Sequence, residues 1–560
     1  MDIWQKYQKS KRYMEAAGIL RRTERNWKFY VGRQWDSVKD SKGLEDLPMM
    51  NFIKPVVKYK VATIAQHQVT AIFSDLNPSH EDHTEICERM SKLFDISWER
   101  AKMDQVVWRQ LKYAAVQGDS YALFAEGDTR KEPQNLVNTQ VYLGDENNPN
   151  IQEQPYIIIR ERITLDEAKE RAEACGASKD DIDNIRTDGD RSDELYNTEE
   201  VSDKVTSLIY LEKKDGIVHI ARAFRDFIYD ELHPIQQTKG DPSLKRYTGR
   251  GLERYPIVSM VWEEQPNTAR GVSEVEQMIP NQLEVNKVLA RRSISVKQAA
   301  FPRLAYDGAM IDNPEDLDKV GAAIKINGGG SQSIANLISF LQPAAQSADA
   351  KVLSDELLKN TKDLAGASDT AMGNIDPSRV SGTAMTTIRD QQQLTLNEQS
   401  AMYNNFVEDV ALLYYDLWRT YFPQGVNFDG IEVSADELND ILPNVRIDIS
   451  ENNTWSRTME QQEISNLFNN GKITLEEYAK LCPDHSNVPK DKLLQVVAER
   501  KEQMQQQQEQ QMAGMPQDGA NITAADDQYV QEQNQIPDQN VGEGLPYQAL
   551  QAMMANQDGM

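Results

Sequence analysis

The chain has 560 residues, 39% of them apolar, and a formal net charge of -27 at pH 7 from 61 Lys+Arg against 88 Asp+Glu. At roughly 150 residues a domain, this length predicts about three or four domains with a real core. The acidity argues against a protein whose whole surface binds nucleic acid by neutralising phosphates. Either the acidity only aids solubility, which is the simpler interpretation, or an acidic wall keeps a passing duplex from sticking.

The cysteines and the first residues indicate a soluble compartment. Cys87, Cys175 and Cys482 are far apart and form no CxxC pair, so we expect reduced thiols rather than a disulfide framework or a zinc ribbon. The opening MDIWQKYQKSKRY lacks the apolar region of a signal peptide. No run approaches the roughly 18 to 20 apolar residues of a membrane span.

The first third of the chain favours helices. Residues 1–35 mix charged and aromatic positions, which predicts one or two amphipathic helices that end near Gly32. Residues 51–72 predict a helix that begins around Pro55, since proline is tolerated in a first turn. Residues 84–117 carry an apolar stripe that predicts one long helix.

The middle of the chain changes to the pattern of strands. We predict strands over 120–125, 156–160, 207–212, 217–221 and 257–261, with a hairpin turn at Asp215-Gly216. The acidic stretches 127–154 and 177–204 are predicted to be surface insertions.

The second half returns to helices around a small module of strands and turns. The predicted order is a helix over 273–300 interrupted by Pro280, strands and turns over 301–330, a helix over 346–372, a break over 373–382 and a helix over 383–422. The last of these would span about 60 Å at a rise of roughly 1.5 Å per residue. A strand over 445–449 and helices over 457–470, 474–481 and 490–503 follow. After about residue 502 the composition turns to Gln, Ala, Gly, Asp and Met, and we expect disorder beyond about 515.

The sequence offers little chemistry. It contains no GxxxxGK[ST], no GxSxG and no Cys/His nucleophile pair. In HEDHTE, His80 and His83 form at most a weak cation site, and the entry of a helix is the favoured interpretation. The glycines at 328–330 are interpreted as a flexible turn. We therefore expect no enzymatic activity, no catalytic or metal-binding residues and no cofactor.

An ordered series of short motifs resembles the portal proteins of tailed bacteriophages, especially the short-tailed type. The resemblance covers roughly residues 20–500, and its order and spacing are more specific than any single motif. The motifs are RNWKFYVGRQW at 25–35, NFIKP at 51–55, GDSY at 118–121, YPIV at 255–258, RGVS at 270–273, MIPNQLEVN at 278–286, FPRL at 301–304, DGAMIDNP at 307–314, GASD at 366–369 and SGTA at 381–384.

The resemblance implies a predominantly helical α+β fold that forms rings. The implied regions are N-terminal helices with an α/β wing (1–271), a first stem helix (272–300), a clip (301–345), a second stem helix (346–372), a tunnel loop (373–382), a long wing and crown helix with a return strand (383–456), a helical crown (457–503) and a Gln-rich tail that we expect to be disordered (504–560).

The implied function is that of a portal: a dodecameric DNA channel at one capsid vertex that serves genome packaging, retention and ejection. Its implied partners are copies of itself in a ring of twelve, the terminase large subunit, adaptor and tail proteins, the major capsid and scaffolding proteins, and double-stranded DNA that passes non-specifically. No membrane is implied. The implied location is the virion, with assembly in the host cytoplasm.

Candidate site residues follow from the same resemblance. For the channel and tunnel loop they are Arg291, Arg292, Lys297, Asn374, Asp376 and Arg379; for docking at the clip they are Arg303, Asp307, Asp312 and Lys325. The helices over 273–300 and 346–372 carry polar residues on several faces, Gln282 and Asn286 among them. That pattern suits a ring in which neighbours and a wet channel share the helix surface. Surface or inter-subunit salt bridges are the alternative role for each charged candidate.

Three other functions compete with this interpretation. An assembly scaffold is disfavoured by the predicted strands and by eight Trp, which indicate a folded core. A packaging ATPase is disfavoured by the missing P-loop. A head–tail adaptor or other structural virion component stays open, because only the stoichiometry of the assembly discriminates it from a portal.

Overall fold

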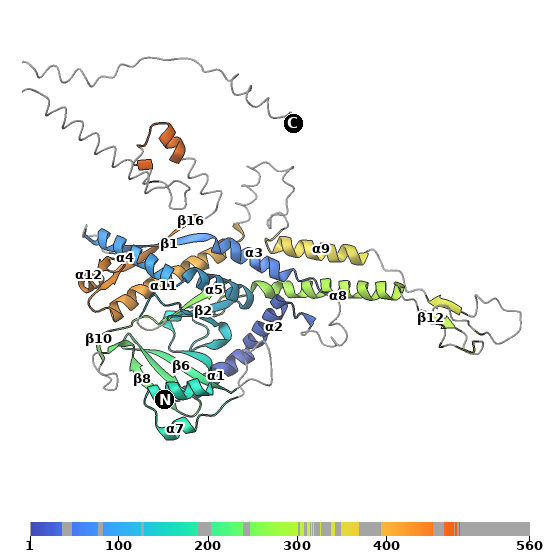
Figure 1. Ribbon diagram of the computed structural model, residues 1–560, viewed down its shortest axis with the longest axis horizontal. Coiled ribbons are helices and arrows are strands. Elements are labelled where there is room, and N and C mark those ends of the chain that lie inside the picture. The colour runs from blue at the N-terminus through green and yellow to red at the C-terminus, as the bar shows by residue number, and fades with distance from the viewer. Residues whose placement is uncertain are drawn as a thin grey trace, which may run out of the picture. The chain divides into compact units, whose positions relative to one another are not determined.

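The structure is a computed structural model in which the chain divides into two compact units, residues 1–456 and 457–560. It describes residues 2–35, 48–76, 82–124, 128–188, 203–238, 247–300, 303–306, 311–313, 315, 317, 325, 338–341, 349–368, 394–451, 464–474, 477–478 and 481. Each unit is described by itself (Figure 1).

The first unit combines helices with several antiparallel sheets, in line with the predicted mixed fold. Its helices are α1 (Ile3–Ala16), α2 (Ile19–Val31), α3 (Ile53–Ala65), α4 (Asp82–Arg100), α5 (Met103–Gln117), α6 (Leu165–Ala174), α7 (Lys179–Asp183), α8 (Glu274–Ala300), α9 (Asp349–Leu364), α11 (Asn397–Tyr421) and α12 (Ala435–Asp440). Its strands are β1 (His67–Asp75), β2 (Asp119–Leu123), β3 (Gln134–Val137), β4 (Val141–Leu143), β5 (Ile157–Thr164), β6 (Lys204–Lys214), β7 (Ile217–Ala223), β8 (Ile228–Pro234), β9 (Gln236–Thr238), β10 (Tyr247–Gly251), β11 (Ile257–Val261), β12 (Arg303–Tyr306), β13 (Ile338–Leu341), β14 (Val426–Phe428), β15 (Ile431–Val433) and β16 (Pro443–Glu451).

The two N-terminal helices begin and end as their sequence predicts. Asp2 caps α1 by accepting a hydrogen bond from the Gln5 amide at 3.0 Å. Gly18 separates α1 from α2, and Gly32 ends α2; both adopt positive φ, at 72° and 99°, which glycine reaches without a steric penalty.

Two helix predictions were wrong in their length. The helix predicted over 51–72 ends at Ala65, because residues 67–75 form β1 and pair with β16 from His67↔Glu451 to Asp75↔Pro443. The helix predicted over 84–117 is two helices, since Lys102 adopts a left-handed φ of 53° between α4 and α5. A backbone in that region cannot continue a right-handed helix.

A five-stranded antiparallel sheet with the order β4-β5-β6-β7-β8 forms one part of the unit. Asp215 and Gly216 have φ of 53° and 80° and join β6 to β7, which confirms the predicted hairpin turn. The stretch 127–154 was predicted to be a surface insertion; instead it supplies β3 and β4, with Leu136 and Val141 fully buried. The tyrosines and aliphatic residues on one face of the sheet pack against Ile3, Tyr7 and Met14 of α1.

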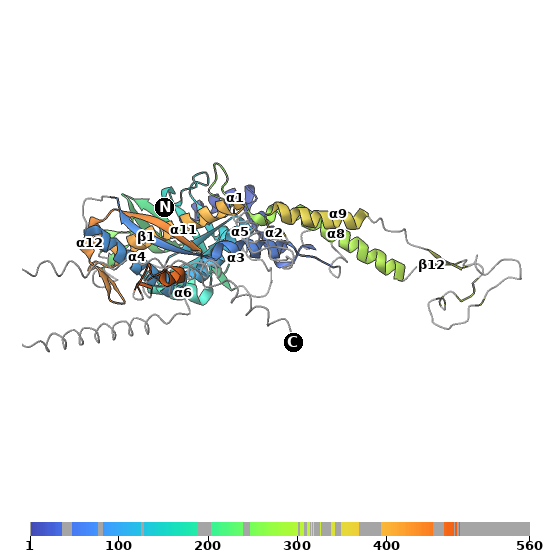
Figure 2. The same cartoon turned by 90° about the horizontal axis from the view of Figure 1, so that it is seen from above.

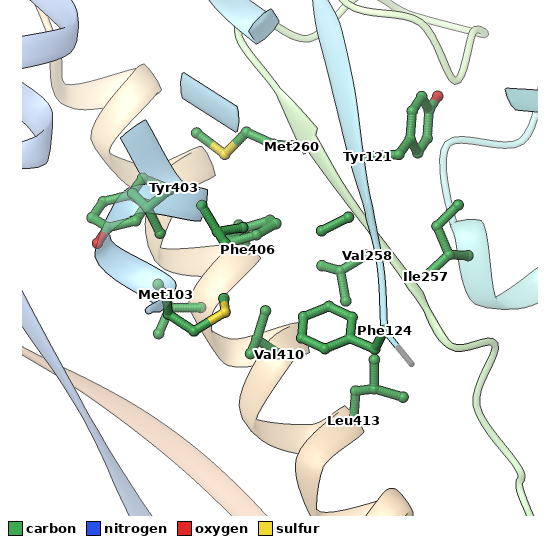
Figure 3. Packing of buried hydrophobic residues seen from close by; sticks show 14 of the residues in the cluster. Met103, Tyr121, Phe124, Ile257, Val258, Met260, Tyr403, Phe406, Val410 and Leu413 are labelled. Carbon is green, nitrogen blue, oxygen red and sulfur yellow. The ribbon is translucent and has the colours of Figure 1, made fainter. Parts of the chain in front are cut away.

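The main core lies between α5, α11 and a three-stranded sheet with the order β11-β2-β3. Figure 3 shows Phe406, Val410 and Leu413 of α11 pointing toward Phe124 and toward Val258 of β11. All of these side chains are almost completely buried. Burial of this apolar surface holds β2 and β11 against the helix and fixes the loop after β11, from which α8 begins.

Two helices extend from this core. α8 runs without a break from Glu274 to Ala300, although Pro280 lies inside it and was predicted to interrupt it. Proline in the interior removes one backbone hydrogen bond, and the loss is confined to an exposed position. α9 lies beside α8 (Figures 1 and 2), where Asn281 Nδ2 donates to Thr361 Oγ1 at 2.9 Å. The antiparallel pair β12–β13 follows α8; β12 lies within the strands and turns predicted over 301–330, whereas β13 lies beyond that range and was missed.

The second unit is described only in part. Residues 464–469 are helical, within the helix predicted over 457–470, and the ring of Phe468 lies 4.9 Å from that of Tyr478. Two more helix predictions were too long, because the helix predicted over 346–372 ends at Leu364 and a turn at residues 395–396 precedes α11, within the helix predicted over 383–422. The predicted helix over 490–503, the expected disorder beyond 515, the break over 373–382 and residues 383–393 lie outside the described residues.

Candidate functional site

The start of α8 is fixed by a close contact between two glycines. A Cβ added to Gly271 would lie 2.2 Å from the Gly118 carbonyl oxygen, and one added to Gly118 would lie 2.3 Å from the Gly271 carbonyl oxygen. Real Cβ atoms do not approach so closely, so each of these positions requires glycine. The contact brings the loop before α8 against the end of α5.

Ser273 caps two helices at once. Its hydroxyl accepts a hydrogen bond from the Val275 amide at 3.0 Å and therefore satisfies one of the free N–H groups at the start of α8. The same hydroxyl lies 2.6 Å from the carbonyl oxygen of Val116, in the last turn of α5. Ser273 is 2% exposed, and the two helix ends thus satisfy each other in the core.

Glu274, the first residue of α8, is held by two side chains from different elements. Lys60 Nζ of α3 lies 2.7 Å from Glu274 Oε1, and Trp262 Nε1 donates to Glu274 Oε2 at 3.1 Å. A carboxylate in the first turn is also stabilised by the helix dipole.

Farther along α8, two buried amides hold the chain before α3. Gln282 Oε1 accepts from the Phe52 amide at 3.0 Å, and Gln282 Nε2 donates to the Met50 carbonyl at 2.5 Å. Asn286 Oδ1 accepts from the Met50 amide at 3.1 Å and from Gln282 Nε2 at 3.2 Å. The two side chains stand one helical turn apart, and both bond to the backbone of residues 50–52, which leads into α3.

The same network reaches the end of α2. Asn286 Nδ2 donates to Gln34 Oε1, and Gln34 Nε2 donates to the Phe29 carbonyl at 3.2 Å. Asn51 Nδ2 donates to the carbonyls of Phe29 and Tyr30 at 3.3 and 3.1 Å. These carbonyls belong to the last turn of α2, where no intrahelical donor remains. Four segments of the chain therefore meet at one polar cluster.

Gln282 and Asn286 were counted among the polar residues that suit a ring with neighbours and a wet channel, and this cluster corrects that interpretation for these two residues. Gln34, Gln282 and Asn286 are each 0% exposed, and their amides are bonded within one chain. Polarity in the sequence did not distinguish these buried amides from exposed ones.

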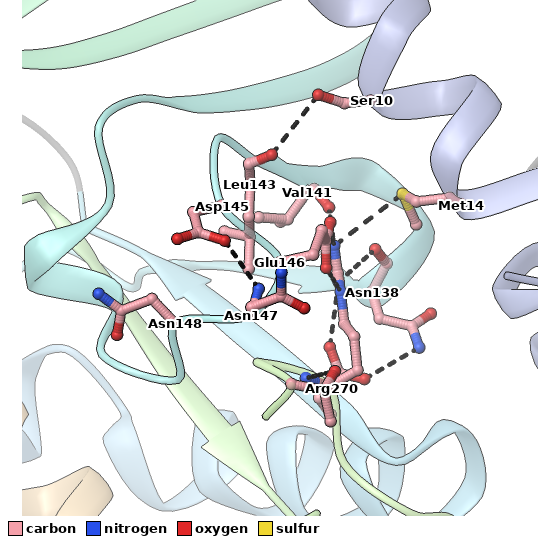
Figure 4. A network of polar contacts seen from close by, with 12 residues as sticks. Ser10, Met14, Asn138, Val141, Leu143, Asp145, Glu146, Asn147, Asn148 and Arg270 are labelled. Carbon is pink, nitrogen blue, oxygen red and sulfur yellow. Dashed lines mark hydrogen bonds and ion pairs between the residues drawn. The ribbon is translucent and has the colours of Figure 1, made fainter. Parts of the chain in front are cut away.

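A buried arginine stands just before α8 (Figure 4). Arg270 makes a two-bond contact with Glu146, Nε to Oε2 and Nη2 to Oε1, both at 2.8 Å. Its Nη1 lies 3.2 Å from Asp119 Oδ2, and its guanidinium also donates to the carbonyls of Asn138 and Val141. Burial raises the pKa of Asp119, and the neighbouring Arg270 guanidinium opposes that rise. Sequence reasoning named Arg270 in a motif but gave it no role.

The second half of α8 is exposed and basic. No side chain from Arg291 to Lys297 is buried. Residues 287–300 contain Lys287, Arg291, Arg292 and Lys297 and no Asp or Glu, in a chain of net charge -27. Arg291 is 71% exposed at its side chain and lies 3.8 Å from Glu284. The structure therefore places Arg291, Arg292 and Lys297, three of the predicted channel residues, together on one projecting half-helix.

The predicted docking residues are only partly described. Arg303 lies on β12. Asp312 and Lys325 are exposed and form an ion pair at 2.5 Å, and the Asp312 amide donates to the Lys325 carbonyl at 3.1 Å. Asp307 and the tunnel-loop candidates Asn374, Asp376 and Arg379 lie outside the described residues.

Neither a metal cluster nor a membrane-spanning helix is found among the described residues. No group of three or more His, Cys, Asp or Glu among them is arranged to hold a metal ion. Across the same residues, no helix combines the length and the apolar composition needed to cross a membrane. His83 of the HEDHTE segment lies 2.5 Å from Asp75 of β1, so it joins the start of α4 to that strand.

Comparison with known proteins gave one family. The profile of the family described as phage portal protein, SPP1 Gp6-like, matches residues 3–513. No curated protein matches the chain. Among similar solved structures is a chain from "Neck of empty GTA particle computed with C6 symmetry", which is 10% identical, with 77% of this chain and 90% of that chain covered and a TM-score of 0.33. A TM-score of this size supports no conclusion about fold or function.

Proposed function

The chain belongs to the phage portal protein family, and we propose that it forms the ring through which viral DNA enters and leaves the capsid. The family match over residues 3–513 carries this proposal. The portal family is one of structural proteins. We accordingly assign the subunit no hydrolytic step, and the ATPase that drives packaging is a separate protein, the terminase large subunit.

The proposed ring contains about twelve copies in a closed, head-to-tail arrangement. Its α8 and α9 helices, the proposed stem, surround the DNA. Repetition of α8 around the ring converts Arg291, Arg292 and Lys297 into rings of positive charge in an otherwise acidic protein. Sparse positive rings attract the phosphate backbone without reading its sequence, and the acidic remainder keeps the duplex from adhering.

The hairpin β12–β13 and its turns form the proposed clip. There the terminase large subunit docks during packaging, and adaptor and tail proteins replace it afterwards. Asp312 and Lys325 are exposed in this proposed clip and form an ion pair with each other. A docking partner can replace that ion pair by contacts with its own side chains. The major capsid and scaffolding proteins are the remaining proposed partners, and the portal vertex of the virion is the proposed location.

Native mass spectrometry of the purified full chain, with class averages from negative-stain electron microscopy, tests the proposal. We expect a closed ring near twelve subunits with a central hole. A compact dimer or trimer without a hole would contradict the portal assignment and favour a head–tail adaptor. A stable monomer that no capsid or scaffolding protein converts to rings would also contradict it.

A further inference from the structure

α8 has an anchored half and a projecting half. Its buried residues end at Ala290, and the anchored half also carries the cap at Ser273 and the ion pair of Glu274. From Arg291 to Lys297 the helix has no buried side chain. Contacts made before residue 291 therefore set the direction of the projecting half. The contacts closest to residue 291 have the largest effect on that direction.

The polar cluster of Gln34, Gln282 and Asn286 lies at that base. An apolar contact tolerates rotation or sliding of a helix, because dispersion attraction has little directional preference. A hydrogen bond weakens steeply as its donor angle falls. Rotation of α8 by one residue would leave the side-chain amides of Gln282 and Asn286 without hydrogen-bond partners. The backbone groups of Met50 and Phe52 would lose theirs as well, and each buried polar group without a partner destabilises the fold.

The cluster also joins α8 to the N-terminal segment. Gln34 is the only one of the three amides that lies outside α8, and it bonds to Asn286 on one side and to the Phe29 carbonyl on the other. α1 and α2 precede it, and α1 packs on the five-stranded sheet. A continuous series of bonds thus runs from the end of α2, through Gln34 and Asn286, to Gln282 and the backbone at 50–52.

We propose that Gln34, Gln282 and Asn286 are positioning residues that lock the rotation and depth of α8 and couple them to the N-terminal segment 2–35. They touch no DNA themselves. They set the face on which Arg291 and Arg292 are presented, and that consequence for the channel rests on the proposed function. Loss of one amide should release α8 locally while the five-stranded sheet stays folded.

Hydrogen–deuterium exchange of the full chain measures this release directly. In Asn286→Leu, amides of α8 beyond 286, of residues 48–52 and of the last turn of α2 should exchange about tenfold faster, the ratio that corresponds to about 1.4 kcal/mol for an orphaned buried amide. Exchange in β5, β6 and β7 should not change. Gln277→Met is the matched control, since Gln277 is an exposed amide on the same helix.

A second variant distinguishes a lock from simple space filling. Gln34→Met keeps the length of the side chain and removes its amide. Because Gln34 and Asn286 bond to each other, the double variant Gln34→Met/Asn286→Leu should exchange no more than about twofold faster than Asn286→Leu alone. If the two side chains contributed independently by packing, the increases in exchange rate of the two single variants would multiply in the double variant.

Three outcomes would overturn the proposal: unchanged exchange in α8, a uniform increase that includes β5–β7, or multiplicative effects in the double variant. The assay does not depend on ring formation. A failure here with rings intact would reject the lock alone, whereas absent rings with the predicted exchange pattern would reject only the portal assignment.

Discussion

At the scale of single residues, Arg270 is a buried cation that pairs with two buried carboxylates. It is 5% exposed and shares its charge between Asp119 and Glu146, which are 1% and 8% exposed. Two carboxylates and one guanidinium leave the cluster electrically unbalanced, and hydrogen bonds from Asn138 and Tyr121 to Asp119 supply part of the remaining stabilisation. Removal of the arginine would leave two buried carboxylates without a cation.

Arg270→Met should therefore lower the free energy of unfolding by about 3–5 kcal/mol at pH 7. Burial already raises the pKa of Asp119, and loss of the guanidinium raises it further. A carboxyl whose folded pKa lies above its unfolded value is tolerated when protonated and costs stability as the pH rises through the folded pKa. The deficit should consequently be smaller at pH 5 than at pH 7.

Urea titrations at both pH values measure this effect. Arg109→Met is the matched control, because the Arg109–Glu132 pair is exposed at 45% and 39% and such pairs contribute roughly 0–1 kcal/mol. An equal deficit at the two pH values would contradict the assigned role of the carboxylates.

At the scale of elements, the sequence predicted those whose cause is local. Asp215-Gly216 identifies a hairpin because both residues tolerate positive φ, and Gly32 ends α2 for the same reason. β1 was missed because its partner β16 lies more than 360 residues later, at His67↔Glu451 and Asp75↔Pro443. The break at Lys102 was missed because a lysine with left-handed backbone gives no turn signal.

The candidate site divides in the same way. The charge of Arg291, Arg292 and Lys297 can be read directly from the sequence, and the structure places these residues on one exposed half-helix. The burial of Gln282 and Asn286 could not be predicted from the sequence, because amide residues occur both in cores and on surfaces. The signal was their spacing of four residues on a helix that also carries an apolar stripe.

The projecting half of α8 gives a prediction about an element. Arg291→Glu together with Lys297→Glu should leave ring formation intact, since both side chains are exposed, and should lower the amount of DNA packaged per particle. The physical reason is that acidic rings replace basic ones along the proposed DNA path. Quantification of packaged DNA in purified particles measures the change.

Arg12→Glu with Lys9→Glu is the control, because these α1 residues are exposed and the change in net charge is the same. Equal amounts of packaged DNA in the two double variants would contradict the assignment of Arg291 and Lys297 to the channel.

At the scale of the whole molecule, the boundary between the two units predicts which C-terminal truncations leave the first unit folded. The first unit ends at Ser456, just after β16. β16 covers β1 along nine residue pairs and packs on α11 as well. Every described helix and strand of the first unit therefore lies before residue 457.

A chain that ends after Ser456 should keep the thermal unfolding transition of the first unit within a few degrees. A chain that ends after Leu442 should lose that transition or lower it by more than about 10 °C, because β1 and the α11 face beneath β16 become exposed to water. Differential scanning calorimetry of both truncated chains against the full chain provides the measurement. Equal midpoints for the two truncated chains would contradict the role assigned to β16.

The pairing of β1 with β16 also has a consequence for synthesis on the ribosome. Translation proceeds at roughly 5–20 residues per second, so β1 waits on the order of 20 to 80 s for the strand that completes it. During that time its hydrogen-bonding groups are open to other nascent chains on the same messenger. The anchors of α8 at Gln34, Met50, Lys60 and Val116 have all been translated before α8 itself. The helix can therefore dock as it emerges, whereas β1 waits longer for its pairing partner than any other strand in the described part of the chain.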